Sequence, residues 1–166
     1  MALVKGPFTI KWGDQGILDV SEIGFNYDVA TNDYTTVDGR TYQIEGAITA
    51  SVELTLLASD VPALRTILPQ YYVAKGGTLS TGETVTDDEG AIDIVAAKCD
   101  TTNINRNLDI ISCTGEVTRL VNARTSLTSQ EFADNSLRTV NITFNGEPEQ
   151  GWGVVQFFKQ GGIEES

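Results

Sequence analysis

The side chains that most often carry enzyme chemistry are scarce in this sequence. Its 166 residues include two cysteines and no histidine. Ser-His-Asp and Cys-His arrangements therefore cannot form, and a conventional zinc site lacks its ligands. The glycine-rich phosphate-binding motifs are missing as well. We therefore expect no catalytic residue, no cofactor and no metal, and we predict that the protein is not an enzyme.

Two remaining groups of side chains could bind a ligand. The run Asp87-Asp88-Glu89 offers carboxylates to Ca²⁺ but lacks the alternating spacing of an EF-hand, so we interpret it as a solvated acidic loop. Trp12 and Trp152 could stack on a sugar, although aromatic side chains more often pack in a core or a subunit interface. Because an acidic chain offers many carboxylate pairs, composition alone leaves glycoside hydrolysis open.

The thiols and the charge indicate the environment of the protein. Cys99 and Cys113 are predicted to be small core residues of a reduced protein, and a disulfide stays open if their strands pair. The 23 acidic and 11 basic side chains give a net charge of −12, which repels nucleic-acid phosphate and excludes a sequence-specific DNA or RNA binder. No secretory signal and no apolar run of membrane-spanning length is visible. We therefore expect no membrane partner, and a product that leaves its cell by lysis or within a particle.

The elements that must position any site are mainly strands. Apolar and small residues alternate with polar ones from Tyr42 to Leu56, which predicts a strand of about fifteen residues and about 50 Å. A second long strand is predicted over 17–29, and the two would form a tall hairpin. Between them, the polar residues 30–41 with the turn signal Asp38-Gly39 are predicted to be a projecting loop.

The rest of the chain adds one helix and several strands. Ser59 or Asp60 can cap a helix that includes Pro62 in its first turn and ends at Pro69. The segment 76–90 is expected to be a loop with room for a small hairpin. Further strands are predicted over four ranges: 92–99, 108–121, 137–145 and 152–158. The polar residues 160–166 are predicted to form a mobile tail.

Together these elements predict one domain over residues 1–166 of the all-β or β-rich α+β class. We expect a two-sheet sandwich or partial barrel with one packed α-helix. The polar side of the 42–56 strand carries no Lys or Arg between Gln43 and Thr55. It is either the wet face of an ordinary sheet or the lining of a channel, and the sequence leaves both open.

Two segments resemble a known family. The run Thr36-Val37-Asp38-Gly39-Arg40-Thr41-Tyr42-Gln43-Ile44-Glu45-Gly46, the alternating strand after it and the helical run from Leu56 to Leu64 resemble the tail tube (major tail) proteins of bacteriophages. The opening, Phe8 to Gly13 followed by Ile17 to Val20, fits the start of such proteins. As a motif the resemblance covers about residues 8–68.

The resemblance implies a structural protein that forms homo-hexameric rings, stacked into the hollow tube through which phage DNA passes without specific binding. Long strands from six subunits would pair into one barrel around the lumen. The partners would be tape measure, terminator, baseplate or tip and sheath proteins. The location would be the virion tail, assembled in the bacterial host cytoplasm. Alternatives are the tube of a secretion or pyocin-like injection system, or a monomeric β-sandwich carbohydrate-binding module.

The resemblance also suggests roles for individual residues. Polar side chains of the long strands would line the channel: Glu45, Thr49, Ser51, Glu53, Glu116 and Thr118. Residues of the projecting loop would contact the next ring: Asn32, Asp33, Tyr34, Asp38 and Arg40.

Overall fold

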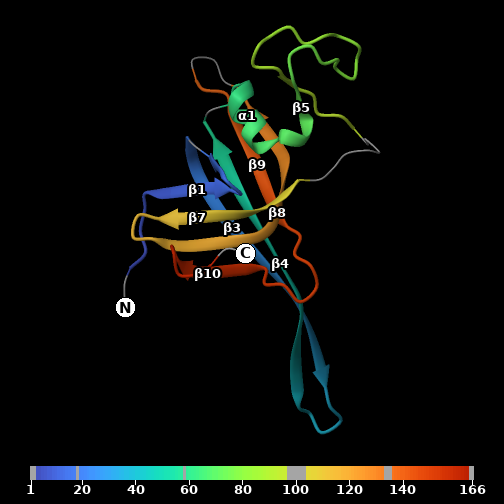
Figure 1. Cartoon of the computed structure of the whole chain (residues 1–166). Helices are drawn as coiled ribbons and strands as arrows, with labels where there is room; N and C mark the ends of the chain where they lie inside the picture. The colour runs from blue at the N-terminus through green and yellow to red at the C-terminus, as the bar shows by residue number, and fades with distance from the viewer. Residues whose placement is uncertain (1–2, 18, 58, 97–103, 133–135, 165–166) are drawn as a thin grey trace.

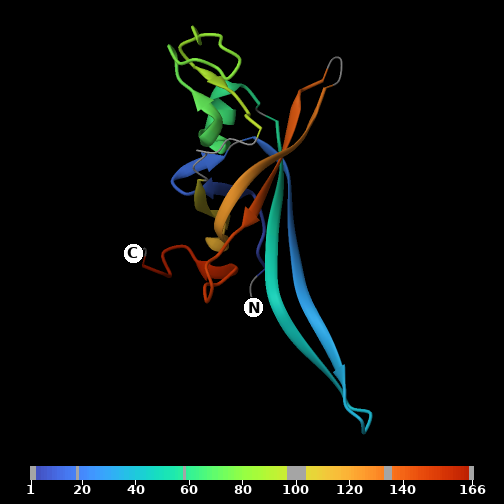
Figure 2. The same cartoon turned by 90° about the vertical axis from the view of Figure 1, so that its right-hand side faces the viewer.

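The computed structural model of the chain describes residues 3–17, 19–57, 59–96, 104–132 and 136–164, except the side chains of residues 44 and 45. Its main antiparallel sheet has eight strands and folds over into two layers joined by strand β8 (Figures 1 and 2). A small second sheet pairs β5 with β6. The predicted β-rich class with one packed α-helix is confirmed, and the described residues form no closed barrel.

One layer, which we call the long-strand layer, holds the two longest neighbouring strands. It contains β3 (Val20–Thr35), β4 (Thr41–Leu56), β9 (Thr139–Gly146) and the C-terminal half of β8 (Glu116–Glu131), in the order β8-β9-β4-β3. Strand β9 pairs only with the last six residues of β4, 51–56. Residues 27–50 therefore extend beyond the sheet as a two-stranded arm, which Figure 2 shows at the lower right.

The other layer, the short-strand layer, is built from the two ends of the chain and a central hairpin. It contains β2 (Gln15–Ile17), β1 (Phe8–Trp12), β7 (Asn105–Ser112), the N-terminal half of β8 and β10 (Val155–Lys159). Strand β8 pairs with β10 over residues 116–120 and with β9 over residues 123–131. One continuous backbone thus belongs to both layers.

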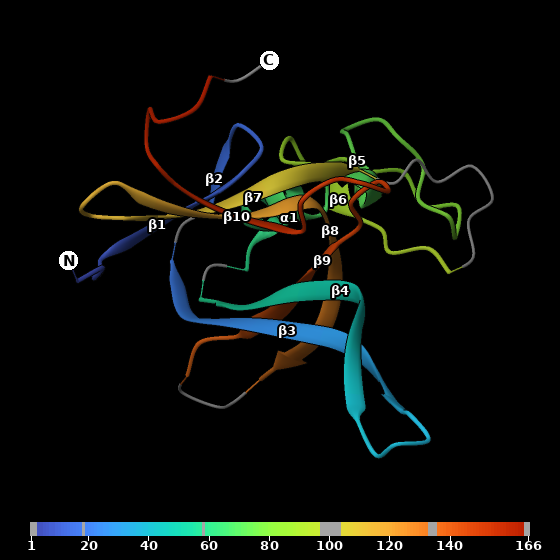
Figure 3. The same cartoon turned by 90° about the horizontal axis from the view of Figure 1, so that it is seen from below.

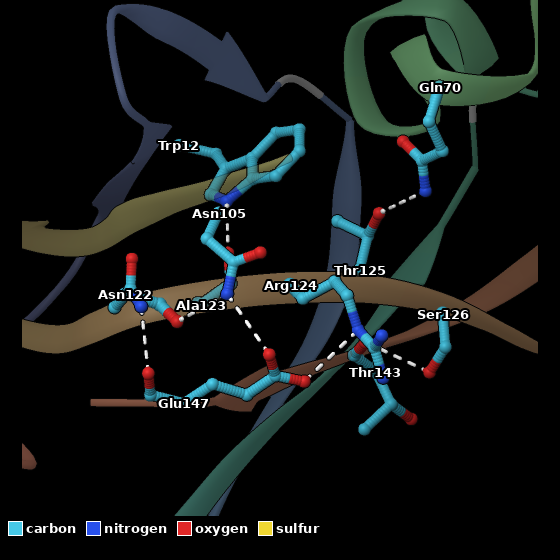
Figure 4. A network of polar contacts seen from close by, with 10 residues as sticks. All are labelled: Trp12, Gln70, Asn105, Asn122, Ala123, Arg124, Thr125, Ser126, Thr143 and Glu147. Atoms are coloured by element: carbon cyan, nitrogen blue, oxygen red, sulfur yellow. Dashed lines mark hydrogen bonds and ion pairs between the residues drawn. The ribbon is translucent and has the colours of Figure 1, made fainter. Parts of the chain in front are cut away.

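The crossing point in β8 is held by a polar network (Figure 4). Asn122 has a φ of 53°, a left-handed conformation that asparagine tolerates better than most residues. The side-chain amide of Asn122 donates to the backbone oxygen of Glu147 at 2.7 Å. The side-chain amide of Asn105 donates to the Glu147 carboxylate at 3.2 Å. Arg124 pairs with the same carboxylate at 3.1 Å. These bonds replace the ladder bonds that the bend removes.

The core lies between the two layers. Trp12 is fully buried, meets the ring of Phe144 edge-on at 5.9 Å, and donates its indole N–H to the backbone oxygen of Ala123 at 3.1 Å. Trp12 thus packs in the core, one of the two positions expected for the tryptophans, whereas Trp152 is 52% exposed. The alternation is also confirmed for β9 and for the 50–56 part of β4, where the even-numbered residues are buried: Ala50, Val52, Leu54, Leu56, Val140, Ile142 and Phe144.

The helix forms where the sequence predicts it. Helix α1 (Val61–Ile67) begins after Asp60, whose carboxylate accepts the Ala63 N–H at 3.3 Å, and a 3-10 turn η1 (Pro69–Tyr71) follows it. Ile67 and Leu68 are buried against the core. No helix among the described residues is long and apolar enough to cross a membrane.

Beyond α1, short strands β5 (Tyr72–Val73) and β6 (Ala91–Ile92) close a loop. Within this loop a bridge between Thr78 and Thr84 forms the small hairpin that the sequence allowed. The strand predicted over 92–99 is wrong beyond Ile92 in its described part, because 93–96 belong to no strand. Cys99 lies outside the described residues, so its pairing with Cys113 stays untested.

The single strand predicted over 108–121 is wrong, because the chain turns back at 113–115 and forms the β7–β8 hairpin. Gly115 has a φ of 92°, which side-chain-bearing residues rarely adopt. Cys113 lies in this turn and is exposed, so the prediction that it is a core residue is also wrong. The last strand, predicted over 152–158, begins later, at Val155.

The loop predicted over 30–41 is largely strand. Strand β3 continues to Thr35 and β4 begins at Thr41, so only residues 36–40 form the turn. Polar residues extend a strand here because both faces of the arm are exposed and no apolar alternation is required. Figure 3 shows β4 bending sharply along the arm.

This bend coincides with a one-residue irregularity. Val29 pairs with Ile48 and Tyr34 pairs with Tyr42, so β4 holds one residue more than β3 between these pairs. Such a bulge exchanges the two faces of the strand. Tyr42 therefore shares a face with Tyr34 and the polar side of the sheet, not with Leu54 as the strict alternation predicts.

Candidate channel-lining face

The polar face of the long-strand layer is built from rows of residues in register across its four strands. One row runs Glu22, Thr55, Asn141, Ser129. The next runs Gly24, Glu53, Thr143, Ser126, and a third runs Asn26, Ser51, Asn145, Arg124. Directly paired residues point to the same side of an antiparallel sheet, so these rows form one surface opposite the core.

This surface is hollowed where three strands bring carboxylates together. A groove of about 580 Å³ is lined by Glu22 of β3, Glu53 of β4 and Glu131 of β8, and its described lining contains no Lys or Arg. The negative charges repel one another and any polyanion, and water keeps them solvated. The described lining of the groove therefore offers no cation that could hold a phosphate group.

Hydroxyl and amide side chains fix the rest of the groove. The Thr55 hydroxyl donates to the Asn141 side-chain oxygen at 2.8 Å, and the Asn141 amide donates to the Ser129 hydroxyl at 2.7 Å. The hydroxyls of Thr128 and Thr143 lie 2.6 Å apart. These bonds tie β4, β9 and β8 together on the polar side, as apolar packing does on the other side.

The structure brings together half of the predicted channel-lining residues. Thr49, Ser51 and Glu53 lie on the polar face. Glu45 lies in β4 opposite Thr31, and its side chain is outside the described residues. Glu116 and Thr118 are not part of this face.

These two residues lie in the short-strand layer, where Glu116 pairs with Lys159 and Thr118 pairs with Phe157. Their misplacement follows from the missed β7–β8 turn. The face also holds Glu22, Glu131 and Asn141, which sequence analysis did not select. Glu22 and Asn141 lay within predicted strands, where a polar residue is informative only when the neighbouring strands are known. Glu131 lay beyond the strand predicted over 108–121, because the sequence analysis did not foresee that β8 continues to it.

The residues predicted to contact a neighbouring ring lie together on the arm. Asn32, Asp33 and Tyr34 belong to β3, and Asp38 and Arg40 belong to the turn. The guanidinium of Arg40 lies 3.7 Å from the Asp38 carboxylate, and both side chains are mostly exposed.

The acidic run Asp87-Asp88-Glu89 is an exposed loop, as interpreted from the sequence. Asp88 pairs with Lys75 at 2.6 Å, and the Asp87 carboxylate accepts the Glu89 N–H at 2.8 Å. Among the described residues, no three His, Cys, Asp or Glu side chains cluster in a way that could hold a metal ion.

Both edges of the long-strand layer are open in the described part of the chain. Strand β3 pairs with β4 alone along its sixteen residues, and residues 126–131 of β8 pair with β9 alone. The four strands alternate in direction, so the two open edges run antiparallel to each other. Unpaired N–H and C=O groups on such edges are available to another strand.

No protein-family model matches the sequence, and no curated protein matches it. Solved structures do resemble the fold. A chain in the tube-terminating cap of the anti-feeding prophage aligns with a TM-score of 0.58 and 13% identity, covering 96% of this chain and 95% of that chain.

Two further structures resemble it over similar lengths. A chain of the sheath/tube terminator of an extracellular contractile injection system aligns with a TM-score of 0.54 and 16% identity, covering 94% of this chain and 99% of that one. A chain in the virion of a gene transfer agent aligns with a TM-score of 0.51 and 13% identity, covering 91% and 95%. The fold is thus one found in the tails and tubes of phage-like particles, as the sequence resemblance predicted.

Proposed function

We propose that this chain is a structural protein that polymerises as stacked hexameric rings into the hollow tail tube of a phage or phage-like particle. DNA passes along the lumen without specific binding. The fold likeness to components of tails and tubes supports the class of the assembly. The number of copies in a ring and the cargo come from the resemblance seen in the sequence.

The observation that carries the proposal is the pair of open edges on the long-strand layer. Strand β3 alone presents about 54 Å of unpaired backbone, at about 3.4 Å per residue, and it contains no Lys, Arg or Pro to block a partner. The long-strand layer has four strands that alternate in direction, so its two edge strands, β8 and β3, run antiparallel. A second copy related by rotation can therefore pair its β8 edge with β3 of the first copy in the antiparallel sense. Repetition of this junction closes a barrel, in which the 126–131 edge of β8 covers a matching part of β3.

The charge of the polar face suits the inside of that barrel. Six copies of a chain with a net charge of −12 sum to about −72 per ring. With Glu22, Glu53 and Glu131 facing the lumen, passing phosphates are repelled and do not stick. The arm residues Asn32, Asp33, Tyr34, Asp38 and Arg40 would then join successive rings, in a particle that also contains tape measure, terminator, baseplate or tip and sheath proteins.

Electron microscopy of the purified protein at high concentration tests the assembly. We expect rings of six copies, and hollow tubes where rings stack. A protein that stays monomeric at high concentration by light scattering, and forms neither rings nor tubes with its particle's initiating proteins, would contradict the proposal.

A charge reversal tests the role of the polar face. Glu53→Lys places a cation in the groove while the side chain stays exposed, so the fold should be unchanged. We expect assembled Glu53→Lys tubes to retain DNA in a salt-dependent way and the parent particle to eject DNA more slowly. The matched control is Glu83→Lys, which makes the same charge change in the exposed loop after β5. Equal DNA retention by both variants would refute a lumenal position for Glu53.

A second candidate is a terminating ring, because two of the similar chains belong to a tube cap and a sheath/tube terminator. A terminator would form one ring and stop, whereas a tube protein would stack without limit. The tube of an injection system other than a phage is distinguished by the particle in which the protein occurs. A sugar-binding module is disfavoured because Trp12, one of its two candidate stacking residues, is fully buried.

A further inference from the structure

The end of the arm presents an apolar side chain on a preformed turn. Val37 is fully exposed. The turn around it is closed by two backbone bonds, from Thr36 N–H to the Arg40 oxygen at 2.7 Å and from Gly39 N–H to the Thr36 oxygen at 3.0 Å. A fixed turn loses little conformational entropy when it binds, and burying a valine side chain is favourable. Val37 therefore has the properties of an anchor for a partner surface.

A groove of suitable chemistry lies on the same chain. It measures about 360 Å³ and lies between β2, the end of β4 and α1. Its accessible apolar lining comes mainly from Pro62 and Ala63, over the buried side chains of Ile17, Leu56 and Ile67, and the carboxylates of Asp19 and Asp60 lie at it as well. The pocket is large enough for a valine side chain with part of its turn.

The turn and the groove lie at opposite ends of the molecule. Figures 1 and 2 show α1 at one end of the long strands and the arm's turn at the other. A turn therefore cannot reach the groove of its own chain. In rings stacked along the strands, the turn of one ring meets the α1 end of the next.

Opposite charges near Val37 and at the groove favour their contact. Arg40 is three residues from Val37, and its ion pair with Asp38 is exposed and therefore weak. The groove carries Asp19 and Asp60, both exposed. A valine entering the groove would bring the guanidinium close to these carboxylates, which can replace Asp38 as its partner.

We infer that Val37 of one copy seats in the groove beside α1 of a second copy in the neighbouring ring, with Arg40 paired to Asp60 or Asp19. This inference rests on the proposed stacking of rings and specifies its contact. It is a heterologous contact, because two different surfaces meet, and it repeats without closing. It accounts for growth into a tube of many rings.

A disulfide between copies tests the contact directly. In a Cys99→Ser, Cys113→Ser background, we combine Val37→Cys with Ala63→Cys, since Ala63 lines the groove. Oxidised assemblies should give a ladder of linked copies on a non-reducing gel. The control pairs Val37→Cys with Glu83→Cys, outside the groove, and should give no ladder. Tubes that form without a ladder from the first pair would overturn the contact and leave the proposed function intact. A lack of both rings and tubes would overturn both.

A second measurement avoids cysteine chemistry. Asp60→Ser keeps a residue that caps helices well, and Asp19→Asn keeps one that tolerates the φ of 57° found there, so the doubly substituted protein should fold. We expect this protein, and separately Val37→Asp, to lose tubes and retain single rings in micrographs. Tubes of unchanged length in both variants would overturn the inference.

Discussion

Strands β8 and β3 are both sixteen residues long, yet their surroundings within one chain are opposite. Strand β8 has neighbours on both edges in its N-terminal half, and its residues 117–125 are mostly buried. Strand β3 has one neighbour, and nearly all of its residues are exposed. The structure of β8 is thus supported by its own chain, whereas β3 has support on one side only.

This difference does not come from strand propensity. Both strands are rich in threonine and in β-branched or aromatic residues. It comes from what covers them. A two-stranded ribbon is marginally stable in water by itself, yet the arm has apolar side chains, Tyr27, Val29 and Ile48, that remain substantially exposed. A long strand with exposed apolar residues and an open edge indicates that other copies of the chain cover it in an assembly.

The largest effect on the isolated chain is expected in the core. Phe144→Ala removes a fully buried ring that contacts Trp12 and leaves a cavity between the layers. We expect the free energy of unfolding to fall by about 3–5 kcal/mol, measured by chemical denaturation of unassembled protein. A loss below about 1 kcal/mol would show that the two layers do not share a packed core.

A smaller effect is expected at the start of α1. Asp60→Ala removes the side-chain acceptor for the Ala63 N–H and should lower the free energy of unfolding by about 1 kcal/mol. Asp60→Ser should restore most of this loss, because serine caps a helix almost as well. Equal losses in the two variants, measured by thermal unfolding, would mean that Asp60 acts by its charge and not by capping.

The smallest effect on the isolated chain is expected in the arm. Val29→Thr with Ile48→Thr replaces a directly paired apolar couple by polar residues that keep β-branching. We expect the free energy of unfolding of the unassembled protein to change by about 0.5 kcal/mol or less. Sedimentation should show weaker assembly. The reverse result, a destabilised chain that assembles normally, would remove the distinction between the arm and the body.

The sequence predicts the fold best where one periodicity runs uninterrupted. The bounds of β4 and α1 were predicted almost residue by residue, because alternation marks the first, at least from Ala50 to Leu56, and Asp60 and Pro69 delimit the second. The β7–β8 hairpin was missed because apolar residues continue at every second position across its turn, from Ile111 through Cys113. Gly115 was the only signal there, and a lone glycine also occurs inside strands.

The polar face could be predicted only in part, for a different reason. Alternation within β4 correctly grouped Thr49, Ser51 and Glu53. Glu22 and Glu131 join them only because β3 and β8 lie on either side of the β4–β9 pair. The order of strands depends on contacts between distant segments, and the periodicity of one segment does not contain it.

The passage of β8 through both layers has a mechanical consequence. The layers cannot slide over each other unless the covalent chain and the Asn122–Glu147 bonds at its bend are disrupted together. Each copy should therefore behave as a stiff unit when the particle is stretched or compressed. Elastic deformation would then concentrate at the seams between copies, where only non-covalent bonds need to yield.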